Sequence, residues 1–342
     1  LFLGGGSTVT IAQRMFEGMN SFALLAIPLY TFAGFTMSKG GISKRLMDFC
    51  YSIVGHIYGG LAHVNVLSSM IFAGISGSAV ADTAGVSGMF MPEMVRKGYS
   101  KNFTVAVTAI SSTIGIIIPP SIPMVVIAGI CGISTGKLFL GGIIPGVLCG
   151  LAQMIVSYFM AKKEGVPKEP GHFTIGPVLH GLWESWPALL MPIIIVGTIT
   201  MGIVSPTEAG VIAVVYGLFA GGIIYRELKW EDIKFAFAET VRTSGRIFIV
   251  IGAAKLYTVM LTTAGFDKWV AKTMLGFSTN PTVILVMILL IFFIVTMFME
   301  SIATLTLFMP ILYPIALGVG IDPIVLSVLI TVVIGVGLVT PP

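Results

Sequence analysis

The sequence predicts an all-α membrane protein that is built as an inverted repeat, with two opposed re-entrant hairpins and broken helices. Its composition sets the class, because 56% of the 342 residues are hydrophobic and only 10% are charged. The mean hydropathy of +1.01 indicates more apolar surface than a water-soluble globule can bury. Motifs that recur in both halves, together with glycine- and serine-rich interruptions of the apolar segments, predict the repeat and the hairpins.

Matched motifs recur in the same order in the two halves of the chain, at offsets of 218 to 224 residues. The pairs are 41–44 with 265–268, Asp82 with Glu300, Phe90-Met91-Pro92 with Phe308-Met309-Pro310, and Pro119-Pro120 with Pro341-Pro342. Apolar sequences share single triplets easily, whereas an ordered series of matches indicates two copies of one unit. The sequence therefore predicts a first repeat at 1–161, a polar cytoplasmic linker at 162–186 and a second repeat at 187–342.

Lys and Arg gather in a few short polar stretches, which the positive-inside rule places on the cytoplasmic side. The first two of these clusters enclose a span-length apolar run at 49–73 and a short return piece at 80–95. The return piece is short for crossing about 30 Å of hydrocarbon, so we expect a re-entrant hairpin with its tip near Ser76. The second hairpin, at 281–318, has no Lys or Arg at its base. Its base is therefore expected on the outer side, and the two hairpins should enter from opposite faces.

Backbone groups at the hairpin tips cannot face lipid, so both tips must be buried in protein or line an aqueous cavity. Unwound carbonyls and Ser or Thr hydroxyls at such tips offer hard oxygen ligands to a small cation. The first cation site is predicted at Ser76, Gly77 and Ser78, with Ser111, Ser112, Thr113 and Gly115 from a broken segment at 103–132. The second is predicted at Ser301, Ala303, Thr304 and Thr306, with Gly337, Val339 and Thr340. The alternative is that these small residues only let helices approach closely.

Four charged residues lie in or beside apolar runs, where a charge costs about 2.5 to 3.5 kcal/mol and marks a functional candidate. They are Asp82, Glu208, Lys255 and Glu300. Asp82 and Glu300 each lie just before a helical run, so capping of the return helices is the alternative role. Capping is favoured for Asp82, and the role of Glu300 stays open because its longer side chain is a poorer cap. The three cysteines lie in apolar segments without metal-ligand spacing and are expected as core residues.

Six short motifs, each weak alone, together match one family. They are 74–82 (GISGSAVAD), Pro92-Glu93-Met94, 111–120, 205–209 (SPTEA), 300–304 (ESIAT) and 338–342 (LVTPP). Through them the chain resembles, over essentially its whole length, the large membrane subunit of tripartite ATP-independent periplasmic (TRAP) transporters. The resemblance implies an elevator-type ion-transporter fold, in which transport elements at about 50–132 and 281–342 move against a scaffold. The amphipathic stretches 8–20 and 227–245 are candidates for its arm helices.

The resemblance also implies a function, which is secondary active uptake of a small carboxylate (a dicarboxylate, sialic acid or a similar acid) coupled to Na⁺. No catalytic residue and no cofactor besides the coupling Na⁺ are expected. The implied partners are a small four-helix membrane subunit and a periplasmic substrate-binding protein, in the cytoplasmic membrane of a bacterium or archaeon, and no nucleic acid. Residues expected to bind the substrate or order the tips are Asp82, Pro119, Pro120, Glu300, Pro341 and Pro342. Relative to the family, helices before Leu1 and after Pro342 are expected to be missing.

Two alternatives stay open. A stand-alone Na⁺/dicarboxylate symporter of the same layout would need no binding protein. An intramembrane serine protease would use Ser76 in Gly74-Ile75-Ser76-Gly77 as its nucleophile, which requires a His base nearby, whereas the later histidines lie in the polar linker. Importing an anion into a negative-inside cell costs about 2.3 kcal/mol per charge at 100 mV, which favours cation coupling over facilitated diffusion.

Overall fold

The computed structural model describes residues 8–166 and 173–340, and every regular element in these ranges is helical. The elements are α1 (Thr8–Met19), η1 (Phe22–Leu25), α2 (Ala26–Lys39), α3 (Ile42–Val54), α4 (Gly60–Ser76), α5 (Ala79–Arg96), α6 (Lys101–Ser112), η2 (Thr113–Ile116), α7 (Ile122–Cys131), α8 (Thr135–Lys163), α9 (Ile175–Thr200), α10 (Pro206–Phe219), η3 (Ala220–Ile224), α11 (Trp230–Thr263), α12 (Phe266–Phe277), α13 (Pro281–Thr296), α14 (Ser301–Gly318) and α15 (Pro323–Gly337). By length and composition, six segments within the described ranges could cross a membrane, namely Phe22–Lys39, α8, α9, Pro206–Ile224, α11 and α14.

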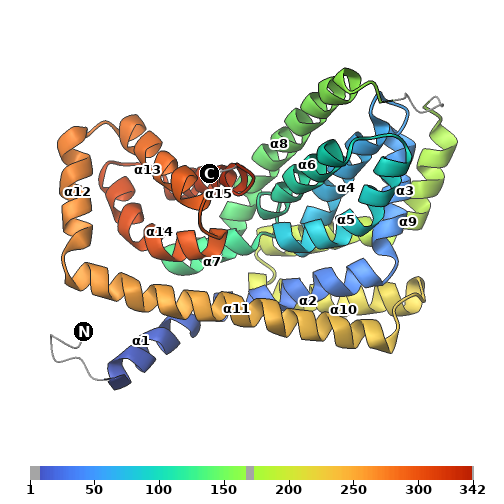
Figure 1. Cartoon of the computed structure of the whole chain (residues 1–342). Coiled ribbons are helices and arrows are strands. Elements are labelled where there is room, and N and C mark those ends of the chain that lie inside the picture. Colours follow the sequence, from blue (N-terminus) through green and yellow to red (C-terminus); the bar gives the residue numbers. More distant parts are fainter. Residues whose placement is uncertain (1–7, 167–172, 341–342) are drawn as a thin grey trace.

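The two halves of the chain contain helices in the same order, as an inverted repeat requires. In this order, α3, α4, α5 and α6 of the first half correspond to α12, α13, α14 and α15 of the second. The α4–α5 hairpin and the α13–α14 hairpin extend in opposite directions from the middle of the molecule, to the right and to the left in Figure 1. The predicted helical membrane architecture with two opposed hairpins is therefore confirmed.

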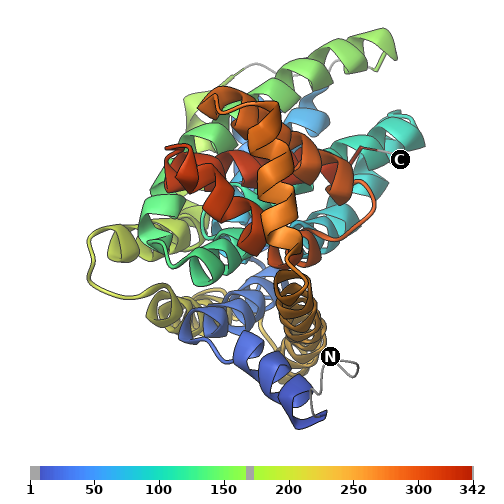
Figure 2. The same ribbon diagram turned by 90° about the vertical axis from the view of Figure 1, so that its left-hand side faces the viewer.

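Helices α1, α2, α10 and α11 form a layer below the two hairpins (Figures 1 and 2). Within it, α11 packs against α1 and α2, and α2 packs against α10. The α1–α2 segment is interrupted at Asn20 and by η1, whereas its counterpart α11 is one continuous helix of 34 residues. Most of the stretch 227–245, the candidate arm helix, is the first part of this longer helix. No proline interrupts 230–263, so the helix runs on into the apolar segment.

Two other segments differ from the sequence expectation. The run at 49–73 is not one helix, because α3 ends at Val54 and α4 begins only after Gly59, its N-cap, which adopts φ +75°. Gly59 also passes close to α8, where a Cβ atom at this position would lie 2.6 Å from Ala161 Cβ. Helix α9 begins at Ile175, inside the range expected to be a polar linker, since apolar residues at 175, 179, 182, 183 and 186 follow the helical period.

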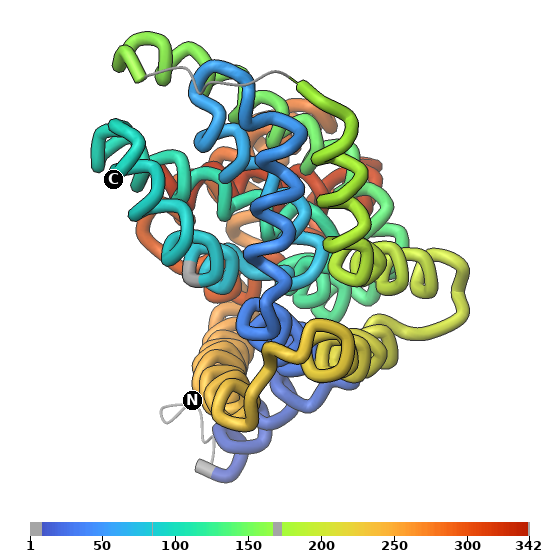
Figure 3. The backbone as a smooth tube through the Cα atoms, turned by 90° about the vertical axis from the view of Figure 1, so that its right-hand side faces the viewer, coloured from blue at the N-terminus to red at the C-terminus, as the bar shows by residue number. Residues whose placement is uncertain are grey.

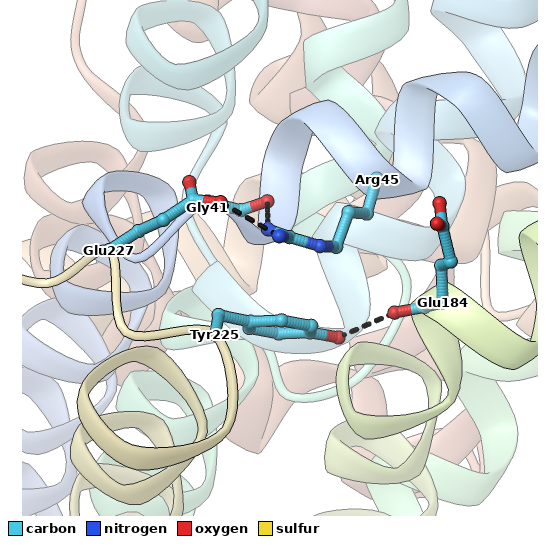
Figure 4. A network of polar contacts seen from close by, with 5 residues as sticks. All are labelled: Gly41, Arg45, Glu184, Tyr225 and Glu227. Atoms are coloured by element: carbon cyan, nitrogen blue, oxygen red, sulfur yellow. Dashed lines mark hydrogen bonds and ion pairs between the residues drawn. The ribbon is translucent and has the colours of Figure 1, made fainter.

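A polar joint connects α3, α9 and the segment that leads from η3 to α11 (Figure 4). Arg45 on α3 forms an ion pair with Glu227 at 2.7 Å and donates to the carbonyl of Gly41 at 2.9 Å. Its guanidinium lies 4.2 Å from the ring centroid of Tyr225, whose hydroxyl donates to the carbonyl of Glu184 on α9 at 3.0 Å. Figure 3 shows α3 beside α9 in this region, and the two helices are in contact. The joint therefore fixes the end of the lower layer against the first repeat.

The backbones of α2 and η3 approach each other closely at this joint, and this approach gives a stability prediction. A Cβ atom on Gly40 would lie 2.9 Å from Gly221 Cα, whereas a Cβ atom on Gly222 meets no atom within 4 Å. We expect Gly40→Ala to destabilise the protein by about 1–3 kcal/mol through overpacking. Gly222→Ala, the matched control, should be neutral or slightly stabilising because alanine favours helix. Thermal unfolding of the two purified variants checks this, and equal melting temperatures would contradict the close approach.

Candidate functional site

The tips of the two hairpins meet at one cavity of about 320 Å³. The first hairpin contributes residues 77–80, and the second contributes residues 300–303. The remaining wall comes from Ile116, Ile122, Pro123, Leu338 and, on α11, Thr243, Arg246, Ile247 and Val250. Segments that are more than two hundred residues apart in the sequence therefore enclose one space between the hairpins and α11.

The tip of the first hairpin is a glycine turn followed by a serine cap. Gly77 ends α4 with φ +65°, and its carbonyl accepts from the backbone N–H of Ile122 at 3.0 Å. A Cβ atom on Gly77 would lie 2.5 Å from the carbonyl oxygen of Pro120, so only glycine fits against the double proline. Ser78 is the N-cap of α5 and accepts from the N–H of Ala81 at 3.4 Å.

Asp82 lies one turn inside α5 and does not cap the helix. The predicted capping role for Asp82 is wrong, because Ser78 occupies the cap and Asp82 turns inward instead. Its side chain is fully buried, and one carboxylate oxygen, Oδ1, accepts from the hydroxyl of Ser76. The other, Oδ2, has no hydrogen-bond partner in the described structure. A Cβ atom on Gly115 would collide with Oδ2, so the carboxylate lies directly against the break in the first broken helix.

A buried polar chain lies behind this tip. Asn65 donates to Thr108 at 2.8 Å and accepts from Ser111 at 3.1 Å, and Ser69 donates to Ser111 at 3.0 Å. The hydroxyl of Ser112 donates to the carbonyl of Thr108 at 2.7 Å. Ser111 therefore joins α6 to α4 through its hydroxyl, whereas the hydroxyl of Ser112 bonds within α6. The sequence did not single out Asn65 and Ser69, since a lone polar residue in an apolar run carries no pattern.

Thr113 behaves in the same way, because its hydroxyl donates to the carbonyl of Ile110 at 2.7 Å. Of the residues predicted for the first cation site, Ser76, Ser78 and Gly115 gather around Asp82. A Cβ atom on Gly115 would also lie 3.4 Å from the carbonyl carbon of Ser78. Only Gly77 and Ser78 of the set reach the wall of the tip cavity, and the others lie behind it.

The tip of the second hairpin is held by Glu300, whose role the sequence left open. Glu300 is the N-cap of α14, and its Oε2 accepts from the N–H groups of Ile302 at 2.8 Å and Ala303 at 3.3 Å. Its Oε1 accepts from the hydroxyl of Ser301 at 2.7 Å, and Thr304 donates to the Glu300 carbonyl at 3.1 Å. This carboxylate thus orders the start of α14, in contrast to Asp82.

The other residues predicted for the second site lie in three places. Thr306 donates to the carbonyl of Ile302 and lines a second cavity of about 210 Å³ that also contains Lys255. Gly337 allows α13 and α15 to approach, since a Cβ atom there would collide with the hydroxyl of Thr296. Thr340 donates to the carbonyl of Val336 at 2.8 Å, and Val339 is half-buried beside it. Pro341 and Pro342 lie outside the described residues.

Arg246 is the cation at the tip cavity, and the sequence interpretation missed it. It projects from the middle of α11, and the described structure gives it neither an ion pair nor a hydrogen bond. It directly follows the predicted arm stretch 227–245, and no sequence motif marked its place between the hairpin tips. Glu208, by contrast, is used locally in a capping box with Ser205 at the start of α10.

The site is thus a cavity between the hairpin tips, with a cation on one wall and a buried carboxylate behind another. An arginine guanidinium can bind a carboxylate through two parallel N–H···O bonds. A buried carboxylate oxygen without a donor requires a cation or a proton to offset its desolvation. The arrangement therefore provides complementary positions for an organic anion and for a small cation near the same hairpin tip.

Comparison with known proteins finds one family over the whole chain. The family model of the tripartite ATP-independent periplasmic transporter, DctM component, matches residues 1–342. The isethionate TRAP transporter permease protein DctMQ of Oleidesulfovibrio alaskensis is 38% identical over 97% of this chain, which spans 52% of that relative. The sialic acid large permease protein SiaM of Vibrio cholerae is 37% identical over 97% of this chain and 77% of its own length. The C4-dicarboxylate large permease protein DctM of Pseudomonas aeruginosa is 36% identical over the whole chain and 80% of its own length.

A solved structure shows the same fold. The Alcanivorax borkumensis YdaH transporter, described as having an unusual topology, superposes with a TM-score of 0.61 and covers 96% of this chain and 77% of its own. At 13% sequence identity this likeness concerns the fold alone. The family match over the full chain and the three relatives above 35% identity show that this protein belongs to the DctM family of TRAP transporter large permease proteins.

Proposed function

We propose that the protein is the large permease subunit of a secondary active transporter that takes up a small organic acid together with Na⁺. The carrying observation is the cavity between the two hairpin tips, which presents Arg246 to an anion while Asp82 lies buried behind the first tip. The relatives are named for isethionate, sialic acid and C4-dicarboxylates, all of which are small organic anions. A small four-helix membrane subunit and a periplasmic binding protein are the proposed partners, in a bacterial or archaeal cytoplasmic membrane.

The first Na⁺ site is proposed at Asp82. Its free carboxylate oxygen is a hard ligand of the kind that small cations prefer. The hydroxyl of Ser76 and the backbone at Ser78 and Gly115 supply further oxygens close by. Bound Na⁺ would satisfy the oxygen that has no donor and would join the first hairpin to the broken helix. A second site at the tip that carries Ser301 and Thr304 is proposed from the repeat, with ligands from backbone carbonyls because the Glu300 carboxylate is fully used.

The position of the cavity supports the proposal of an elevator motion. Hairpin residues line one side of it and α11 lines the other, so the cargo lies at the boundary between the hairpins and the lower layer. Movement of both hairpins against α1, α2, α10 and α11 would carry the cargo across the membrane. Na⁺ supplies the driving force, because each imported negative charge costs about 2.3 kcal/mol at 100 mV.

Hydrolysis at Ser76 has no support in the geometry. The Ser76 hydroxyl donates to Asp82, and the ring of His63 on the same helix faces the carbonyl of Tyr58 at 3.1 Å. A nucleophilic serine needs a base within hydrogen-bond reach that can accept its proton and later return it. Transport is therefore the function that the site supports.

Reconstitution of the permease and small subunit into proteoliposomes tests the proposed function. We expect accumulation of an organic acid only when an inward Na⁺ gradient and a cargo-loaded binding protein are both present. Uptake of free substrate without the binding protein would instead favour the stand-alone symporter. Uptake that is equally fast in K⁺ would exclude Na⁺ coupling.

Asp82→Asn should abolish the effect of Na⁺ without unfolding the protein. Removal of an unpaired buried charge leaves the ion-free state as stable as before or more stable. The wild-type protein should gain about 2.7 kcal/mol of stability at a hundredfold excess of Na⁺ over its dissociation constant, and the variant should gain none. Melting temperatures in NaCl and in KCl check this. An unchanged Na⁺-dependent shift in the variant would remove Asp82 from the site.

Glu300→Gln should lower the stability of the protein and leave its Na⁺ dependence unchanged. Glutamine offers one acceptor oxygen for the three donors that the carboxylate now satisfies, so the start of α14 should lose about 0.5–2 kcal/mol. The Na⁺ concentration at half-maximal uptake should stay close to the wild-type value, because the Glu300 carboxylate holds the helix and not the ion. The measurement compares the melting temperature and the Na⁺ dependence of uptake of this variant with those of Asp82→Asn under identical conditions. A loss of Na⁺ dependence equal to that of Asp82→Asn would contradict a purely capping role.

A further inference from the structure

We propose that the cargo carries a single anionic group, held by Arg246 of α11, and an uncharged body that lies along the apolar wall of the tip cavity. This inference rests on the proposed function and specifies the class of its substrate. A small monocarboxylate or monosulfonate fits this description, and a dicarboxylate does not. The same geometry makes Arg246 the specificity-determining residue of the site.

The wall of the tip cavity contains few charged groups. Among the lining residues, only Arg246 and Glu300 are charged. Both carboxylate oxygens of Glu300 are engaged by three donors on residues 301–303, so this group holds the start of its own helix and does not attract an anion. Arg246 has its guanidinium donors unengaged in the described structure. The cavity therefore provides one strong anion partner.

The apolar part of the wall disfavours a second charge on the cargo. The lining of the cavity is largely apolar and includes Ile116, Ile122, Ile247, Val250, Ile302 and Leu338. A second carboxylate placed there would lose its hydration without gaining a charged partner, which is strongly unfavourable. Asp82 neutralises a cation bound behind the first tip, so that cation is already paired. An uncharged body gains from the same surface, because burial of apolar groups is favourable.

Arg246 lies on α11, outside the two hairpins. Helix α11 packs against α14 of the second hairpin and against α1 and α2 of the lower layer. Arg246 therefore approaches the cargo from outside both hairpins. The anion contact spans the boundary between the hairpin tips and α11, and it is available only while the tips face this part of the helix.

Ligand binding to the purified permease with its small subunit, in Na⁺, tests the proposal with a matched pair of acids. The probes are 2-hydroxybutyrate and malate, which differ only in a terminal methyl group and a second carboxylate. Saturable stabilisation against thermal unfolding gives the affinity. We expect 2-hydroxybutyrate to bind at least about tenfold more tightly than malate. Arg246→Gln should weaken 2-hydroxybutyrate by roughly 30-fold or more, as loss of one partner of a desolvated charge pair does.

Lys255→Gln is the control variant. Lys255 lies on the same helix but lines the other cavity, so this variant removes the same charge from α11 without changing the tip cavity and should bind like the wild type. Arg246→Lys should give an intermediate affinity, because an ammonium keeps the charge but loses the two-pronged geometry. Malate binding as tight as 2-hydroxybutyrate would overturn the cargo class. Wild-type affinity for 2-hydroxybutyrate in Arg246→Gln would exclude Arg246 as the residue that holds the anionic group.

If the protein does not transport an organic acid at all, the binding experiment gives a different result. In that case neither acid binds and isethionate and sialic acid do not bind either, in Na⁺ or in K⁺, although the protein unfolds cooperatively. Tight binding of malate with strong Na⁺ dependence would refute the single-charge inference and leave the proposed function intact.

Discussion

The structure depends on the need to satisfy the backbone at two hairpin tips that are buried away from water. Each tip leaves N–H and carbonyl groups without helical partners, and within a membrane these groups must be paired inside the protein. The first tip meets this need through Gly77 and Ile122, whose backbones hydrogen-bond to each other. The second meets it through the Glu300 carboxylate, which accepts from two N–H groups. The cavity lies where these two solutions meet.

The same constraint explains why two residues at equivalent positions of the repeat do different work. Asp82 and Glu300 are matched by sequence, but Ser78 precedes Asp82 and takes the cap of α5. Asp82 is thereby free to turn into the protein, towards Ser76 and Gly115. The corresponding residue before α14 is Thr296, which lies in α13 with its hydroxyl bonded to the Phe292 carbonyl, and Glu300 itself becomes the cap. The two repeats thus have similar backbones but different polar contacts at their tips.

Much of the fold could be predicted from the sequence, because the signals for it are local or periodic. Hydropathy, the offset between Asp82 and Glu300, and the distribution of Lys and Arg were enough to place the hairpins. The site was harder to predict, because it depends on which groups meet in space. Arg246 faces the hairpin tips only because α11 runs beneath them, and Thr306 lies in a different cavity although it is close to the tip in sequence.

The length of α11 has a mechanical consequence. Its 34 residues form a continuous rod of about 51 Å, far longer than the hydrocarbon layer of about 30 Å. One end lies near the joint of Arg45 and Glu227, and the other continues into α12 at the base of the second hairpin. An unbroken hydrogen-bonded helix resists bending, so a shift at either end is transmitted to the other. The rod therefore links the two ends of the molecule as a lever, and the guanidinium of Arg246 sits near its midpoint.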